Sequence, residues 1–323
     1  MPEQRSSSRR QTDYGPESLG LPAALLHPRY WGVWAAAGLL WLLTWLPWRV
    51  RSAIAVPFGA LAYRASGKRR RIAEVNLQLC FPELGPQQRR RLIRLHFRYK
   101  LRALLDYPIL WWGSRRRLQR LVRIEGEEHY REHFEAGRPV VLFMPHSVAL
   151  DFGASALARS YPGVGLIKPA SNPLVNWLML RGRLRFGGRL FTRRSGMLAL
   201  VRAVRGGSFF YYLPDEDLGE RASTFVPFFG VPAATLTTLG RLARACHAAV
   251  VPAAAYYEPE HGRYVLRLSP ALQDFPTATA EQDALRMNRE LEQAIRRRPE
   301  QYLWTMKLFK TRPPGEPSLY GGD

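Results

Sequence analysis

One histidine and one aspartate, His146 and Asp151, could carry acid–base chemistry in this sequence of 323 residues. His146 follows the apolar run Val140–Met144 and Pro145, and Asp151 comes five residues later. A neutral imidazole can act as a general base, and a carboxylate bonded to its other nitrogen fixes the tautomer and raises its basicity. The pair therefore suggests base catalysis with Asp151 orienting His146. The spacing is equally compatible with a histidine and an unrelated aspartate at the start of a helix.

The geometry of a five-residue offset restricts the elements that can carry the pair. In a straight α-helix this offset turns a side chain by about 500°, roughly 140° away from the starting face. The two side chains can meet if His146 lies in a turn after a strand and Asp151 in the first turn of the next helix. Pro145 favours this arrangement, because it ends the strand and restricts the residue before it. We therefore expect a site at the carboxyl end of a strand, where open α/β sheets bind ligands.

The rest of the chain alternates short β-type runs with helical patterns. Helices are predicted over 72–112, with a turn at 81–86, and over 280–297. A buried strand is predicted over 209–213, and a hairpin over 250–268. Such alternation is typical of an α/β domain with a mostly parallel central sheet covered by helices.

The run Tyr30–Trp48 contains 19 residues without a charge and has tryptophans near both ends. About 20 apolar residues cross a bilayer, and tryptophan is enriched at its interfaces. We expect one N-terminal transmembrane helix, with a flexible tail at 1–28, a membrane anchor at 29–51 and the α/β domain at 52–323. The basic residues after the run predict a single-pass protein with this domain on the cytoplasmic face. A buried or interfacial helix stays open as the alternative, because Pro47 interrupts the run.

The net charge of +22 requires an anionic partner: nucleic acid, an anionic membrane, a phosphorylated substrate or an acidic carrier protein. The apolar run favours an anionic membrane. No nucleic-acid-binding module is recognisable, so we expect no nucleic acid partner. The two cysteines, Cys80 and Cys246, stand in unrelated contexts, which predicts no disulfide and a reducing compartment.

Two other kinds of site, a serine nucleophile and a metal site, have weaker support in the sequence. Ser147 is next to His146, but the sequence has no G-x-S-x-G elbow, and adjacent residues are poorly placed for a Ser–His hydrogen bond. The acidic cluster Asp215-Glu216-Asp217 follows a strand, but no histidine accompanies it at a metal-binding spacing. We expect neither a metal nor a cofactor.

Several blocks of the sequence occur in the order and at the spacing of a known family. They are His27-Pro28-Arg29-Tyr30-Trp31-Gly32, Asn76-Leu77-Gln78-Leu79-Cys80-Phe81-Pro82-Glu83, Pro145–Asp151, Asn172-Pro173, Gly182-Arg183-Leu184-Arg185, Tyr212–Asp217, Phe225–Gly230, Pro299–Trp304 and Phe309–Pro313. Through them the chain resembles the late (secondary) acyltransferases of lipid A biosynthesis in Gram-negative bacteria. The resemblance runs from His27 nearly to the C-terminus.

This resemblance implies a reaction, partners and a location. The reaction is transfer of a lauroyl or myristoyl chain from acyl carrier protein to a hydroxyacyl chain of a lipid A precursor, either Kdo2-lipid IVA or its lauroylated product. The implied fold is similar to that of the glycerol-phosphate acyltransferases, and the implied location is the bacterial inner membrane. A basic surface would attract both the acidic carrier protein and the phosphorylated lipid.

The resemblance also implies roles for individual residues. His146 would deprotonate the acceptor hydroxyl, Asp151 would orient His146, and Arg183 would stabilise the oxyanion or hold a phosphate. Asp215 would pair with Arg183 or shape the site. Arg185 and Asn172, in matched blocks, are predicted to bind substrate together with Asp215.

Alternatives stay open at this point. A glycerolipid-type acyltransferase would use the same dyad, although the sequence lacks an E-G-T-R phosphate motif. A non-enzymatic basic membrane-binding protein would explain the charge alone. The apolar stretch Phe225–Leu239 is either a wall of the acyl-chain groove or ordinary core. Neither the acyl chain length nor the acylation state of the acceptor follows from the sequence.

Overall fold

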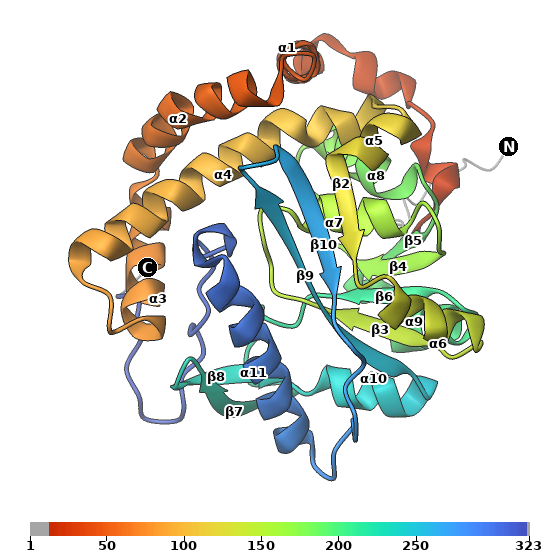
Figure 1. Ribbon diagram of the computed structural model, residues 1–323, viewed down its shortest axis with the longest axis vertical. Helices are drawn as coiled ribbons and strands as arrows, with labels where there is room; N and C mark the ends of the chain where they lie inside the picture. Colours follow the sequence, from red (N-terminus) through yellow and green to blue (C-terminus); the bar gives the residue numbers. More distant parts are fainter. Residues whose placement is uncertain (1–12, 322–323) are drawn as a thin grey trace, which may run out of the picture.

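The computed structural model describes residues 13–321 and contains, within them, one eight-stranded sheet of mainly parallel strands (Figure 1). The strand order is β1-β5-β4-β6-β3-β9-β10-β2. Strands β5, β4, β6, β3 and β9 run parallel to one another, and β2 runs parallel to β10. Only the β1–β5 and β9–β10 pairs of this sheet are antiparallel. The predicted α/β fold with a mostly parallel sheet is therefore confirmed.

The strands of this sheet are short. They are β1 (Asp13–Tyr14), β2 (Val122–Glu125), β3 (Val140–Phe143), β4 (Gly163–Leu166), β5 (Arg189–Phe191), β6 (Phe209–Tyr212), β9 (Ala249–Glu258) and β10 (Arg263–Leu268). A separate two-stranded sheet pairs β7 (Ser223–Phe228) with β8 (Val231–Leu236).

Helices cover both faces of the large sheet (Figure 1). The helices are α1 (Trp31–Leu43), α2 (Trp48–Ala65), α3 (Gly67–Cys80), α4 (Pro86–Trp112), α5 (Arg115–Leu121), α6 (Glu128–Glu135), α7 (Leu150–Leu157), α8 (Pro173–Leu184), α9 (Met197–Arg205), α10 (Thr238–Cys246) and α11 (Ala280–Arg297). Five 3-10 turns complete the described elements: η1 (Pro16–Leu19), η2 (Ala23–Leu26), η3 (Pro28–Tyr30), η4 (Arg193–Ser195) and η5 (Pro299–Gln301).

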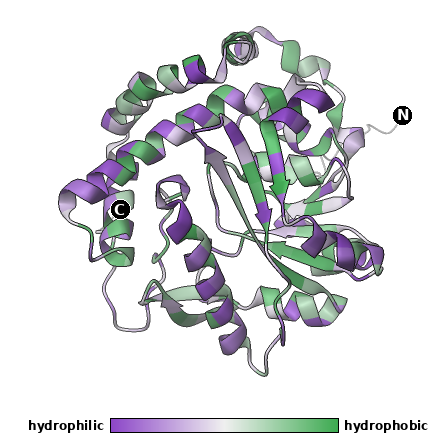
Figure 2. Ribbon diagram, viewed as in Figure 1, coloured by the Kyte–Doolittle hydropathy of each residue, from purple (hydrophilic) through white to green (hydrophobic). Residues whose placement is uncertain are grey.

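The central strands separate two apolar cores, because successive side chains of a strand point to opposite faces. In β3, Val140 and Leu142 join the core under α7 and α8, whereas Val141 and Phe143 join the core under α9, α10 and α11. All four side chains are buried, as expected for a parallel strand covered on both faces. Figure 2 shows mainly hydrophilic residues along α11, whose apolar side faces this second core.

The predicted elements around the site are confirmed. The strand before His146 is β3, and the helix after it is α7, which begins at Leu150. The long helical region divides into α3 and α4 at the expected turn, and the predicted hairpin is β9–β10. The helix predicted at the C-terminal end is α11.

The predicted transmembrane helix and the single-pass location are wrong. The apolar run forms α1, which ends at Leu43 after 13 residues and is followed by a turn before α2 begins at Trp48. At about 1.5 Å per residue, 13 residues extend roughly 20 Å, well short of a hydrocarbon core of about 30 Å. Across residues 13–321 no helix has both the length and the apolar character that a membrane crossing needs. The uncharged run is therefore not one helix, because residues 44–46 form a turn and Trp48, its last residue, begins α2.

The predicted tail at 1–28 falls partly on residues 1–12, which lie outside the described residues. Its described remainder contains β1, η1 and η2, and Asp13 and Tyr14 pair with β5. The division into tail, anchor and α/β domain stays a prediction.

Candidate active site

The neighbouring strands β3 and β6 end beside each other, and each is followed by one residue of the candidate site. Their register pairs Phe143 with Tyr212. His146 and Asp215 each come three residues later, so the parallel pairing brings both to the carboxyl edge of the sheet.

His146 is bound twice by Asp215. Its Nδ1 lies 2.7 Å from Asp215 Oδ1, and its backbone N–H donates to Asp215 Oδ2 at 2.8 Å. The side chain of Asp215 is buried, and that of His146 is 19% exposed. Because the carboxylate only accepts, Nδ1 carries the hydrogen, and Nε2 is left as the basic nitrogen.

Electrostatics couples the two groups. Burial opposes the charged form of His146, but the charge and hydrogen bond of Asp215 outweigh it and raise the pKa of His146 above its ordinary value of 6.5. Burial likewise opposes the charged form of Asp215, but the interaction with His146 outweighs it and lowers the pKa of Asp215. The pair is therefore arranged to stabilise an imidazolium at this position.

Asp151 lies in the first turn of α7 and pairs with Arg183 of α8. Arg183 Nε donates to Asp151 Oδ1 at 2.7 Å, and Nη2 donates to Oδ2 at 3.2 Å. The Tyr107 hydroxyl of α4 also donates to Oδ2, at 2.6 Å. Within the described part of the chain, Nη1 of Arg183 makes no hydrogen bond, so one guanidinium nitrogen is available to a substrate.

The hydrogen-bond partners of His146 and Arg183 therefore differ from those that the sequence suggested. The carboxylate bonded to His146 is that of Asp215, and Asp151 holds Arg183 instead. Because α7 starts four residues after His146, Asp151 points toward α8 and α4. The register of β3 and β6 instead places Asp215 beside His146. The pairing of adjacent strand ends was the signal that could have found Asp215, since both residues follow apolar strands. Tyr107 had no such signal, because only the fold brings α4 to α7.

Arg185 and Asn172, the other two predicted substrate-binding residues, make internal contacts. Arg185 donates to the carbonyls of Leu110 and Gly113, at 3.2 and 2.5 Å. Asn172 is the N-cap of α8 and accepts from two backbone N–H groups. These contacts account for both residues without a ligand, and their binding role stays a prediction.

The residues of the rival chemistries also have internal partners. Ser147 is buried, and its hydroxyl donates to the Ala255 carbonyl at 2.7 Å. Asp217 accepts from the backbone and hydroxyl of Thr311, at 2.6 and 2.7 Å, so this carboxylate ties the C-terminal segment to the domain. Over residues 13–321 no three His, Cys, Asp or Glu side chains are grouped as metal ligands.

A hollow adjoins the Asp151–Arg183 pair on the α7 and α8 side of the sheet. Both residues line it, together with mostly small or apolar side chains from α7, β4 and β5, among them Ala154, Gly165 and Leu190. The stretch Phe225–Leu239 instead forms β7, β8 and the start of α10, and most of its apolar side chains are buried. Phe228, Phe229, Ala233 and Leu239 belong to the second core.

The mostly parallel sheet, with helices on both faces, places the chain among the α/β proteins, whose ligands usually bind at the carboxyl edge where His146 lies. Comparison with known proteins identifies the family. The family model described as "Bacterial lipid A biosynthesis acyltransferase" matches residues 21–311. The chain belongs to this family and is an acyltransferase, which confirms the resemblance found in the sequence.

Individual relatives cover nearly the whole chain. It is 38% identical to the lipid A biosynthesis lauroyltransferase of Escherichia coli K12 over 92% of this chain and 97% of that protein. It is 33% identical to the lipid A biosynthesis myristoyltransferase of the same organism over 97% of both. The crystal structure of the 1-acyl-sn-glycerophosphate acyltransferase from Thermotoga maritima matches at a TM-score of 0.37 and 11% identity, covering 77% of this chain and 97% of that one.

Proposed function

We propose that this acyltransferase moves a fatty acyl chain from acyl carrier protein to a hydroxyacyl chain of a lipid A precursor, Kdo2-lipid IVA or its lauroylated product. The names of the relatives support the acceptor class. The observation that carries the chemistry is the 2.7 Å contact between His146 Nδ1 and Asp215, which leaves Nε2 as a base at the carboxyl edge of the sheet.

In this proposal His146 acts as the general base. Nε2 takes the proton of the acceptor hydroxyl as that oxygen attacks the thioester carbonyl. The tetrahedral intermediate then collapses, the carbon–sulfur bond breaks, and the imidazolium returns its proton to the leaving thiolate. An ester and a free thiol result. Asp215 holds the tautomer and stabilises the imidazolium throughout.

Arg183 is proposed to face the negative charge that develops on the thioester oxygen, or a phosphate of the acceptor. Its free Nη1 is the group that would donate, and a charge-assisted hydrogen bond of this kind is stronger than a neutral one. Asp151 and Tyr107 serve as positioning residues, because the two-pronged contact of Asp151 fixes the plane of the guanidinium. The hollow beside this pair is proposed to receive the acyl chain of the donor, since it is mainly apolar.

An anionic membrane surface is proposed as a further partner. Leu39, Leu42 and Trp45 of α1 and the turn after it are 59%, 66% and 68% exposed, and Phe58 and Leu61 of α2 are 57% and 61% exposed. These side chains, here called the outer apolar face, lie on the helices along one outer edge of the molecule (Figure 1). Exposed apolar groups of this size are typical of an interaction surface, and the net charge of +22 favours anionic lipid.

The test is a mass-spectrometric assay of the purified full chain with lauroyl and myristoyl carrier protein and both acceptors. We expect a mass gain of one acyl group on at least one acceptor, and loss of this product in His146→Ala. The matched control is His261→Ala, an exposed histidine of the β9–β10 turn, which should keep wild-type turnover. Retained transfer in His146→Ala would refute the base mechanism, and no transfer from any carrier protein would refute the proposed donor.

A further inference from the structure

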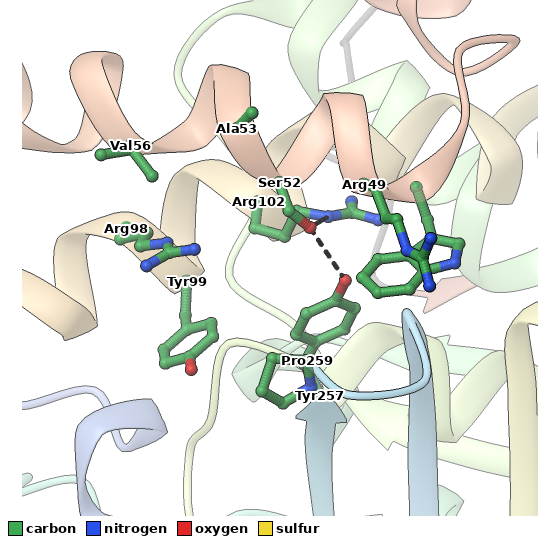
Figure 3. A pocket seen from close by; sticks show the side chains of 10 residues that line it. Arg49, Ser52, Ala53, Val56, Arg98, Tyr99, Arg102, Tyr257 and Pro259 are labelled. Carbon is green, nitrogen blue, oxygen red and sulfur yellow. Dashed lines mark hydrogen bonds between the residues drawn. The ribbon is translucent and has the colours of Figure 1, made fainter.

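A pocket of about 380 Å³ lies between α2, α4 and the end of β9, and none of the proposed catalytic residues lines it (Figure 3). Its volume is within the range of small-molecule sites. Its charged lining residues are three arginines, Arg49, Arg98 and Arg102, and its lining includes no carboxylate. An arginine-lined pocket without a lining acid favours an anionic ligand.

Arg102 is the buried member of this set, at 1% exposure. Its Nη1 pairs with Asp106, and its Nε donates to Ser52 Oγ at 3.1 Å. Its Nη2 is buried and has no hydrogen-bond partner within the described residues. A buried unsatisfied donor on a charged group is costly, so a small movement of the side chain that let Nη2 donate to a ligand in the pocket would remove this cost.

The balance of charge around Arg102 is also positive. Asp106 is shared, because it pairs with Arg51 as well as Arg102 and accepts from the Tyr264 hydroxyl at 3.0 Å. Burial and the neighbouring Arg102 lower the pKa of Arg51 to about 10. One carboxylate thus serves two buried guanidinium groups.

Arg49 and Arg98 lie nearer the solvent than Arg102. Figure 3 shows them on either side of the hydrogen bond between Ser52 and Tyr257. Within the described residues neither makes an ion pair with a carboxylate. Arg98 stands one helical turn before Arg102 on α4, so both present to the same face. Like charges around one pocket repel one another, and an anion between them would relieve this repulsion.

Apart from Ser52, the rest of the lining is apolar or aromatic and includes Trp48, Val56 and Tyr99. Val56 is itself exposed, and it stands on α2, the helix that carries Phe58 and Leu61 of the outer apolar face. Phe58 and Leu61 lie about 200° and 140° around the helix axis from Val56, so the exposed apolar group at the pocket itself is Val56. A cationic pocket with an exposed apolar side chain at its rim matches a ligand with a charged head and a hydrocarbon tail.

We propose that this pocket binds the phosphate group of a lipid. A phosphate presents several oxygens to guanidinium donors, which suits Nη2 of Arg102 and the two outer arginines. The adjoining side chains of α2 would contact the acyl portion. The inference deepens the proposed function, because it rests on the proposal that α1 and α2 face lipid, and it adds a binding site separate from the His146–Asp215 pair.

The experiment is calorimetric titration of the full chain with dihexanoyl phosphatidic acid below its micelle concentration, and with inorganic phosphate. We expect saturable lipid binding that is weaker by about tenfold or more in Arg49→Gln/Arg98→Gln, as for the loss of charged hydrogen bonds. The control is Arg241→Gln/Arg289→Gln, which removes the same charge from exposed positions of α10 and α11 and should bind within about twofold of wild type.

The possible outcomes separate the claims. Equal weakening in the two double variants would mean that net charge alone attracts the lipid and would overturn the pocket. Equal affinity for inorganic phosphate would overturn the lipid as the source of the phosphate. Cooperative thermal unfolding of both double variants would show that they are folded. If His146→Ala then binds the lipid like wild type, a failure of acyl transfer would count against the proposed function and not against this pocket.

Discussion

At the scale of single residues, the pairing of His146 with Asp215 decides how the site can work. The backbone of His146 is held on both sides. Its N–H donates to the Asp215 carboxylate, and its carbonyl accepts from the backbone N–H of Leu303. The histidine is thereby fixed between the end of β3 and the C-terminal segment. Such a base needs little rearrangement when a substrate hydroxyl arrives.

A second histidine, His96, gives a prediction about stability. It lies fully buried on α4, and burial, with a smaller effect of Lys100, lowers its pKa to about 3. The unfolded chain therefore binds a proton near pH 6.5 that the folded chain takes up only near pH 3, so stability falls as the pH drops between these values. We expect the free energy of unfolding to fall by up to about 1.4 kcal/mol per pH unit from this group.

Urea unfolding of wild type and His96→Gln between these pH values measures the effect. The difference between the two proteins should shrink as the pH falls, and it should not change in the exposed control His261→Gln. A difference that is constant with pH would show that the pKa of His96 is the same in the folded and unfolded chains, and would contradict the lowered value.

At the scale of elements, the helices around the outer edge connect the site to its proposed membrane partner. The α1 helix ends after 13 residues and α2 starts afresh, so the apolar side chains form an exposed surface instead of a span. Pro47 and the turn before it make this break.

The outer apolar face yields a prediction for vesicle binding. Burying a leucine contributes about 1.5–3 kcal/mol, so Leu42→Ser should weaken co-sedimentation with phosphatidylglycerol vesicles by about tenfold. Leu198→Ser is the matched control, because Leu198 of α9 is 61% exposed, close to the 66% of Leu42. Equal effects of the two substitutions would show that this face does not contact the membrane.

Most elements were predictable because their signals are local. Strand β3 is a continuous apolar run ended by Pro145, and the break between α3 and α4 is marked by Pro82 and Pro86. The transmembrane prediction failed because hydropathy measures composition, whereas the position where α1 ends depends on local turns. Thr44, for example, turns its hydroxyl back to the Trp41 carbonyl at 2.7 Å.

The site was predictable only in part for the same reason. His146 stands at a local strand end, and its place at the carboxyl edge followed from the sequence. Its partner depends on the order of strands in the sheet, which places β6 beside β3 and so brings Asp215 from 69 residues away. The contact of Tyr107 with Asp151 depends further on the packing of α4 over α7.

At the scale of the whole molecule, the net charge of +22 predicts how the enzyme meets its donor. An acidic carrier protein would be attracted over a distance that salt shortens. We expect kcat/KM with acyl carrier protein as donor to fall by roughly tenfold between about 0.05 and about 0.5 M salt. A small acyl thioester without the carrier should show a much weaker dependence. Equal salt dependence of the two donors would argue against an electrostatic docking of the carrier.

The measurement that tests the central claim most directly is the pH dependence of kcat/KM in wild type, Asp215→Asn and Asp151→Asn. In the proposed mechanism the neutral imidazole is the base, so wild-type activity should rise with pH through an apparent pKa above 6.5. Asp215→Asn removes the charge that raises this pKa, so the rise should move to lower pH and the plateau should fall by roughly 10²–10⁴.

Asp151→Asn should lower the plateau through Arg183 and shift the rise much less, because Asp151 holds the arginine and Asp215 holds the base. A shift in Asp151→Asn as large as that in Asp215→Asn, or a profile unchanged in Asp215→Asn, would contradict the pairing on which the mechanism rests.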